Sequence, residues 1–213
     1  MQYGTMLTAG VLALTCLACV IAIGKARKGY AEGDQPALFC ALLGFALPAA
    51  AAATAAMRYG VDPSWQAANL WLSQADSFLA LPLLGAAALA LGRSWTWSRP
   101  NWGRILLGLC AFFELFRQMN ALEDYRLALH LATLALLLYA GAVQWPRRTP
   151  LTAAGGVVAL LLGAGLLGTE GSIGPLRRLD LFYLVLTPAY PLLAWLLLTL
   201  PGGATESHSP QAA

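Results

Sequence analysis

The chain has few charged side chains and almost no lysine or histidine. Only 11% of its 213 residues are charged, whereas 59% are hydrophobic. Soluble globular domains carry about 25% charged residues, so this composition excludes an ordinary soluble fold. The apolar residues occur in long runs without strand-like alternation, which excludes a membrane β-barrel and predicts membrane-spanning helices.

The scarcity of lysine and histidine also excludes several cofactor sites. The only lysines are Lys25 and Lys28, so the last apolar run has none to form a Schiff base with retinal. His130 is the only histidine in an apolar run, because His208 lies near the C-terminus, and bis-histidine haem and three-histidine zinc sites are excluded. No phosphate-binding glycine loop and no hydrolase motif occurs. The cofactor is therefore unknown, and we expect no nucleic-acid partner.

Seven apolar runs are long enough to cross the roughly 30 Å hydrocarbon layer as helices. We predict an all-α bundle of seven transmembrane helices in one domain, residues 1–200, and a disordered cytoplasmic tail, residues 201–213. The predicted spans are 4–24, 37–57, 67–92, 105–122, 126–145, 151–168 and 181–200. The fourth is the most polar, and the count falls to five if the fourth and fifth form one re-entrant hairpin.

Basic residues predict the orientation, because lysine and arginine in short loops are retained on the cytoplasmic side. One side of the predicted bundle holds eight of the 13 basic residues, namely Lys25, Arg27, Lys28, Arg93, Arg99, Arg104, Arg147 and Arg148. The other side holds Arg58, Arg126, Arg177 and Arg178. We therefore predict an outside N-terminus and an inside C-terminus, in a bacterial-type inner (plasma) membrane. Trp95, Trp97, Trp102 and Trp145 are expected at the inner membrane surface.

Four ionisable residues interrupt the predicted spans: Asp76, Glu114, Arg117 and His130. Such groups are costly in hydrocarbon and indicate a functional site. Helical spacing adds Asn69 to the face of Asp76, and Asp180, Tyr183 and Thr187 form one stripe of the last span. We predict one pocket that opens outward, with Glu114 deepest. Its expected ligand-binding residues are Asp76, Glu114, Arg117, Gln118, Arg126, His130, Asp180 and Tyr183.

Part of this group also has a structural interpretation. Glu114 and Arg117, three residues apart, can neutralise each other on one helix. A lone His130 suits a hydrogen-bonded packing position. Asp124 and Asp180 are candidates for the N-caps of the fifth and seventh helices.

Three functions fit the predicted pocket. The first is a transporter or lipid-handling protein that binds a small anionic or amphiphilic ligand through Arg117 and one of Arg126, Arg177 or Arg178. The second is an enzyme acting on a lipid or lipid-linked substrate at the outer leaflet, with Glu114 or His130 as general base and Asp76 as orienting group. These three groups could also ligate a divalent metal, but without a local motif we assign none. The third is a non-catalytic subunit or assembly factor of a membrane complex.

Small residues and prolines predict how the helices pack. Gly155, Ala159 and Gly163 follow a small-xxx-small spacing, which favours close contact with a neighbouring helix, a partner protein or a second copy. Pro188 and Pro191 predict a broken last helix. Cys16 and Cys19 lie in an apolar run, where they are interpreted as small packing residues rather than as a redox pair.

Overall fold

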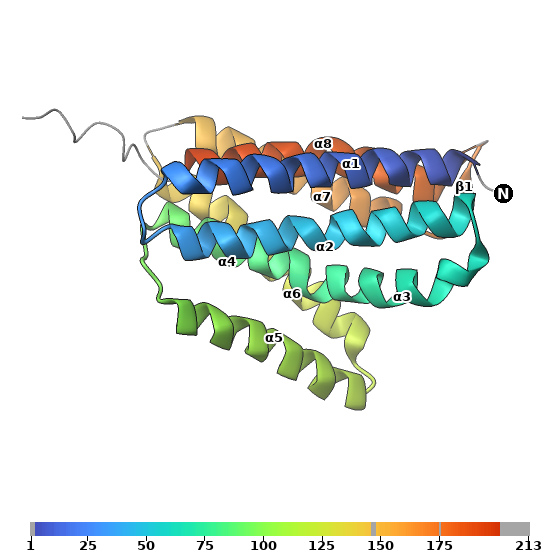
Figure 1. Ribbon diagram of the computed structural model, residues 1–213, viewed down its shortest axis with the longest axis horizontal. Coiled ribbons are helices and arrows are strands. Elements are labelled where there is room, and N and C mark those ends of the chain that lie inside the picture. The colour runs from blue at the N-terminus through green and yellow to red at the C-terminus, as the bar shows by residue number, and fades with distance from the viewer. Residues whose placement is uncertain (1–2, 146–147, 175, 201–213) are drawn as a thin grey trace, which may run out of the picture.

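The computed structural model describes residues 3–145, 148–174 and 176–200, and these form a helical bundle with one small β-hairpin (Figure 1). Arg147 and the predicted tail, residues 201–213, lie outside the described residues. The helices are α1 (Tyr3–Ala26), α2 (Gln35–Gly60), α3 (Gln66–Ala75), α4 (Leu81–Gly92), α5 (Arg99–Gln118), α6 (Leu122–Val143), α7 (Arg148–Leu167) and α8 (Arg178–Thr199). Short elements are the 3₁₀ turns η1 (Arg27–Gly29) and η2 (Pro63–Trp65), the π-turn η3 (Asp76–Ala80) and the strands β1 (Ser172–Ile173) and β2 (Leu176–Arg177).

Six helical segments of the described chain are long and apolar enough to cross a membrane. They are Tyr3–Gly29, Gln35–Gly60, Pro63–Gly92, Leu122–Val143, Arg148–Leu167 and Arg178–Thr199. The predicted all-α bundle is confirmed with these six helical segments, and the count of seven spans stays a prediction. The exception is the predicted span 105–122, where α5 begins earlier and carries Arg99, Arg104, Glu114 and Arg117.

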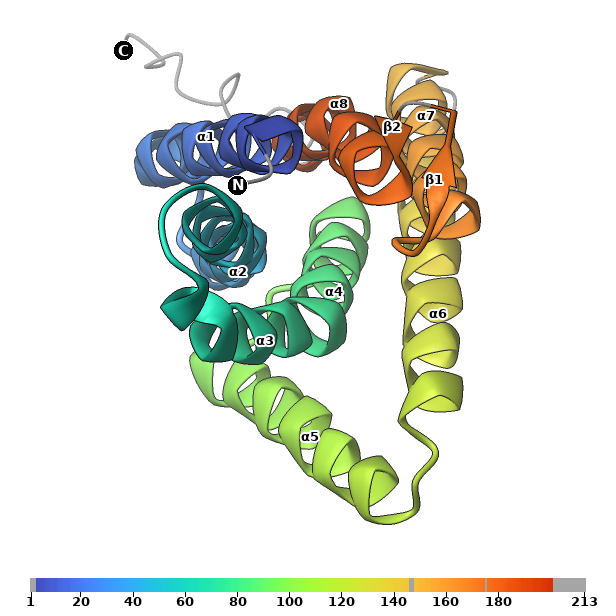
Figure 2. The same cartoon turned by 90° about the vertical axis from the view of Figure 1, so that its right-hand side faces the viewer.

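Helix α5 also lies apart from the rest of the bundle. Figure 2 shows it beneath α3, with α2, α3 and α4 between it and the pair α1 and α8. Trp102 is its only buried residue. Aromatic rings attach its far half to the bundle: the Phe113 ring lies 4.9 Å from that of Phe78, and Phe116 stacks on Tyr125 at 4.7 Å. The charged residues of α5 are consistent with its position, because a helix with few buried residues leaves its polar side chains exposed.

The third span is continuous but irregular. Asp62 caps its first turn by accepting a hydrogen bond of 2.9 Å from the Ser64 N–H, which lowers the pKa of the Asp62 carboxyl. Near its middle the chain widens into η3, which ends two residues before Pro82. A proline ring clashes with the carbonyl four residues earlier, and a wider turn relieves that clash.

The predicted break in the last helix is wrong. Helix α8 runs without interruption through Pro188 and Pro191. It packs along both α1 and α7, and Ala189, Tyr190 and Leu193 are buried around the two prolines. Tertiary packing therefore holds this segment helical despite the two missing N–H donors.

The capping prediction is also corrected. Asp124 and Asp180 lie inside the first turns of α6 and α8, after Leu122 and Arg178, and not at the N-cap positions. A carboxylate in the first turn still interacts favourably with the positive end of the helix dipole.

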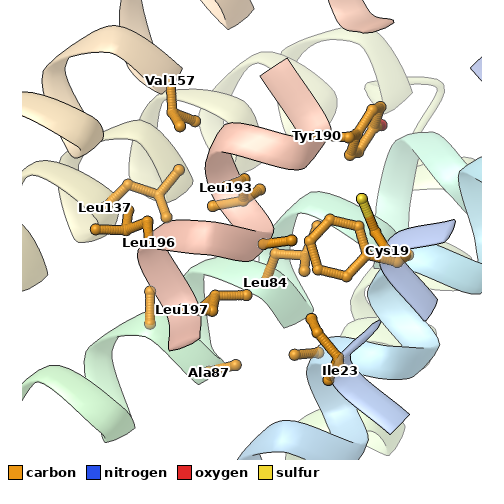
Figure 3. Packing of buried hydrophobic residues seen from close by; sticks show 14 of the residues in the cluster. Cys19, Ile23, Leu84, Ala87, Leu137, Val157, Tyr190, Leu193, Leu196 and Leu197 are labelled. Atoms are coloured by element: carbon orange, nitrogen blue, oxygen red, sulfur yellow. The ribbon is translucent and has the colours of Figure 1, made fainter. Parts of the chain in front are cut away.

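The core is made where α8 meets α1, α4, α6 and α7. Figure 3 shows side chains from all five helices meeting there, including Leu193 and Leu197 of α8, Leu84 of α4 and Ile23 of α1. Because lipid is as apolar as these side chains, close approach of small residues contributes much of the cohesion. A Cβ on Gly141 would lie 2.7 Å from the Ala154 Cβ, so only glycine permits this spacing of α6 and α7. Cys16 and Cys19 are free thiols buried in the core.

The connections alternate between two ends of the bundle. We call the end with the start of α1, the α2–α3 turn and the β-hairpin the Tyr3 end, and the end with the α1–α2 and α4–α5 loops the Tyr30 end (Figure 1). The predicted cytoplasmic basic residues among the described positions belong to the loops and helix ends of the Tyr30 end. The loop assignment agrees with the helix order, and the orientation in the membrane stays a prediction.

Candidate functional site

The eight predicted ligand-binding residues are divided among four elements. Asp76 starts η3, Asp180 and Tyr183 lie on α8, Arg126 and His130 on α6, and Glu114, Arg117 and Gln118 on α5. Asp76 and Asp180 both lie in electrostatic range of Tyr183. Glu114, Arg117 and Arg126, by contrast, are engaged on the surfaces of their own helices.

The polar residues of α5 satisfy one another on the surface. Arg117 donates two hydrogen bonds of 2.7 Å to the Glu114 carboxylate, and Gln118 donates a third of 3.0 Å. The side chains of Arg117 and Glu114 are 57% and 45% exposed. The prediction that Glu114 is the deepest group is therefore wrong. On α6, exposed Arg126 pairs in the same way with Glu123. Neither arginine offers an unpaired cation to an anionic ligand.

His130 supports the backbone of the third span. Its Nε2 lies 3.2 Å from the Ser77 carbonyl oxygen, which only accepts, so His130 donates. In a π-turn the carbonyl of residue i bonds the N–H of residue i+5, and the residue five after Ser77 is Pro82, which has no N–H. The histidine therefore satisfies a carbonyl that the proline leaves without its backbone partner. This contact matches the packing interpretation of His130.

Asp76 has different surroundings, although it is the neighbour of Ser77. It lies thirteen residues after Pro63 in a segment of 30 residues, about 20 Å along the helix axis and near the middle of the span. Its carboxyl lies deep in the bundle, where the residue is half-buried, and it is in electrostatic range of Tyr183, Tyr190 and Cys16. Among the described residues it has no hydrogen-bond or ion-pair partner. Of the predicted site residues, a carboxyl in a predicted span without a partner is the hardest to explain by a structural role alone.

A second carboxyl lies toward the Tyr3 end. Asp180 is 8% exposed, and its Oδ1 has no partner in the described part of the chain. Its Oδ2 faces the first turn of α1, where a Cβ on Gly4 would lie 3.3 Å from it. The neighbouring Thr5 is 1% exposed, and its hydroxyl is also unpaired within the same described ranges. Buried polar atoms are almost always paired with protein or water, so these two are available to a ligand or water.

Tyr183 connects the two carboxyls. Its hydroxyl is in electrostatic range of both Asp180 and Asp76, and also of Arg58 on α2. It lies three residues after Asp180 on α8, and Tyr190 follows two turns later. We call Asp180, Tyr183, Asp76 and Tyr190 the carboxyl column.

Arg58 is a cation beside the column, and α3 holds it in place. Its Nη1 donates to the Asn69 Oδ1 at 3.3 Å, and its guanidinium lies 5.1 Å from the centre of the Tyr59 ring. The Asn69 amide in turn donates to the Ala51 carbonyl at 3.2 Å and lies 3.4 Å from the Ser73 hydroxyl. From its sequence position Arg58 is expected on the outer side of the bundle, and neither Thr5 nor Tyr190 is among the predicted site residues. A single hydroxyl on the buried face of α1 was the one available signal for Thr5.

The described residues contain no group of three histidine, cysteine or acidic side chains that could hold a metal ion. Asp76, Glu114 and His130 are thus not assembled as a metal site. The fold is a helical bundle whose described part holds six helices long and apolar enough to span a membrane, which suggests a multi-pass membrane protein. No protein-family model, no curated protein and no solved structure matches the chain.

Proposed function

We propose that the protein is a membrane transport protein in which Asp76 binds a proton or a small cation that arrives from the Tyr3 end. The supporting observation is the half-buried Asp76 carboxyl deep in the bundle, which has no hydrogen-bond or ion-pair partner among the described residues. A bare carboxylate in a low-dielectric interior is costly, and a bound proton or cation removes much of that cost. The bound proton or cation would thus act as the partner that the Asp76 carboxylate lacks.

The charges of the interior favour a cation over the anionic ligand that the sequence suggests. The column contains two carboxyls, whereas Arg117 and Arg126 are exposed and paired with glutamates of their own helices. Arg58 is a cation near the column, and it is engaged with neutral Asn69. Arg177 and Arg178 precede Asp180 at the start of α8. An amphiphilic ligand with a cationic group is compatible with this arrangement, whereas an acidic ligand would meet two like charges.

The order of groups along α8 suggests the route. Asp180 is nearest the Tyr3 end, the Tyr183 hydroxyl can both donate and accept a hydrogen bond, and Asp76 follows at mid-depth. Beyond Tyr190 the same helix is lined by buried leucines, including Leu193 and Leu197. This conformation is therefore closed toward the Tyr30 end, as alternating access requires of one state.

The enzyme alternative has less support. The two candidate bases are engaged, since His130 donates to the Ser77 carbonyl and Glu114 accepts from Arg117. The subunit alternative has one favourable observation, on α7. A Cβ on Gly155 or Gly163 would meet nothing within 4 Å, so the small-residue face is not used in the packing of this chain. A partner helix or a second copy on that face is our second candidate.

Proton and cation flux into proteoliposomes tests the proposal. The purified protein is reconstituted with an internal pH-sensitive dye, and uptake is driven by a membrane potential, with and without Na⁺ or K⁺. We expect Asp76→Asn to abolish the flux and Asp180→Asn to slow it, while Glu114→Gln, a carboxyl change on the surface of α5, leaves it unchanged. Size-exclusion profiles and circular dichroism confirm folding. Flux that persists in Asp76→Asn, or a wild-type flux no greater than in empty vesicles, would refute the proposal.

A further inference from the structure

A polar cavity lies at the Tyr30 end, away from the carboxyl column. Its volume is about 450 Å³, and it is formed between the α1–α2 loop and the α4–α5 loop. Its lining consists of Glu32, Gly33, Gln35, Pro36, Thr96, Trp97, Ser98 and Arg99. None of these residues belongs to the predicted ligand-binding group, so the cavity is independent of the transport proposal.

Several contacts fix the walls of this cavity. Gly33 approaches the opposite loop so closely that a Cβ there would lie 2.6 Å from the Thr96 Cγ2. The Tyr30 hydroxyl donates to the Leu198 carbonyl at 2.8 Å, which ties the α1–α2 loop to the end of α8. On the other side Trp97 packs on Trp102, with ring centres 5.3 Å apart. The two loops therefore form a defined cavity and not a chance gap.

The cavity carries one charge of each sign. Glu32 and Arg99 both line it and are exposed, yet they form no ion pair with each other in the part of the chain that the structure describes. The first turns of α2 and α5 also border it. Pro36 and Pro100 in these turns have no N–H. The N–H groups of Gln35 and Arg99, by contrast, lack an acceptor within their helix. A dipolar ligand would meet Arg99 and the N–H groups with its negative part and Glu32 with its positive part.

Its position identifies the kind of dipolar molecule. The cavity lies at the ends of the spans α1, α2 and α4, beside Trp95, Trp97 and Trp102, and tryptophan is enriched at the headgroup level of membranes. Arg99 lines it, and further basic residues lie in the loops and helix ends of the same end of the bundle, which favours a phosphate group. We propose that the cavity binds the headgroup of an ethanolamine phospholipid, with the phosphate on Arg99 and the primary ammonium on Glu32.

Lipid binding by purified protein tests this assignment. The full chain is delipidated in detergent and titrated with phosphatidylethanolamine, phosphatidylcholine or phosphatidylglycerol, and bound lipid is counted by native mass spectrometry. We expect phosphatidylethanolamine to bind best, because the quaternary amine of choline has no N–H to donate to Glu32 and glycerol has no charge to offer it. Glu32→Gln should remove the preference for phosphatidylethanolamine over phosphatidylcholine. Arg99→Gln should weaken the binding of these two lipids by roughly tenfold.

The matched control is Arg104→Gln on the same helix. Arg104 donates to Asn101 at 3.2 Å and does not line the cavity, so its loss should leave the lipid preference unchanged. Soluble phosphoethanolamine in a parallel titration separates the headgroup from the lipid: competition by it supports recognition of the headgroup itself, and its failure to compete overturns the assignment. Equal binding of the three lipids, or equal loss in Arg99→Gln and Arg104→Gln, also overturns it. These outcomes are independent of cation flux.

Discussion

The contact between His130 and the π-turn makes a quantitative prediction. His130→Phe keeps a planar ring at the position but removes the donor, so the Ser77 carbonyl loses its partner. A buried orphaned acceptor costs about 1–3 kcal/mol, whereas hydrogen bonds between membrane helices average about 0.6 kcal/mol because the unfolded state in the membrane finds other partners. Within the π-turn geometry Ser77 has no backbone partner of its own, since position 82 is proline. We therefore expect a loss of about 1–2 kcal/mol.

A second substitution isolates the hydrogen bond from the change of shape. Pro82→Ala restores an N–H at position 82, which allows the third span to satisfy the Ser77 carbonyl by backbone hydrogen bonding. In the Pro82→Ala background, His130→Phe should then cost less than about 0.5 kcal/mol. The two residues should be coupled even though position 82 makes no hydrogen bond to the imidazole.

The assay is reversible unfolding in mixed micelles with increasing denaturing detergent, followed by circular dichroism for the wild type, the two single variants and the double variant. The coupling energy is the difference between the cost of His130→Phe with and without Pro82. An equal cost in the two backgrounds would show that the histidine contributes only packing, and the explanation of the π-turn would then be wrong.

Three further predictions concern packing and charge. Gly141→Ala places a Cβ 2.7 Å from that of Ala154 and should destabilise the folded protein by about 1–3 kcal/mol. Gly108→Ala on α5, where nothing lies within 4 Å of the added Cβ, should not destabilise it. Thermal unfolding of the two variants tests this difference. Gly163→Leu should leave the monomer folded but change the oligomeric state measured by light scattering. Gly156→Leu should impair folding instead, because a Cβ at position 156 would lie 3.0 Å from the Leu192 Cδ2. An unchanged oligomeric state in Gly163→Leu would rule out an interface on this face of α7. Glu114→Gln should leave the melting temperature unchanged within error, because the pair with Arg117 is exposed, and a large loss would place α5 in a different environment.

Hydropathy alone finds the six spans because each is a long run in which few charges occur. The predicted span in α5 differs from these six: its apolar residues from Ile105 to Phe116 resemble a span, although four charged residues lie along the helix. Proline positions are also not sufficient to predict helix geometry. Pro82 and Pro188 look equivalent in sequence, but the helix widens before the first and stays regular through the second, because packing on α1 and α7 decides the outcome.

The position of a residue within an apolar run does not distinguish the carboxylates of Glu114 and Asp76. Glu114 and Asp76 each lie about nine residues into a predicted span, so sequence position ranks them alike. Their helical neighbours differ, however. Glu114 has Arg117 and Gln118 one turn away and satisfies itself on the surface, whereas Asp76 has only Ser73 as a polar residue at that spacing. A carboxylate without a local partner depends on tertiary contacts or on a ligand, and this distinction was available in the sequence.

The same distinction connects the irregular backbone with the proposed transport. Asp76 is the first residue of η3, and the Ser77 carbonyl beside it is held by His130 on α6, so one turn positions both the half-buried carboxyl and the contact that stabilises it. If the turn returned to α-helical geometry, the Ser77 carbonyl would gain a backbone partner, and each residue before the turn would rotate relative to α4. The Asp76 carboxyl would rotate with them and change its position relative to Tyr183 and Tyr190, which are now in electrostatic range of it. Loading of Asp76 and the geometry of η3 are therefore expected to be coupled, so Pro82→Ala should alter cation flux even though residue 82 does not belong to the column.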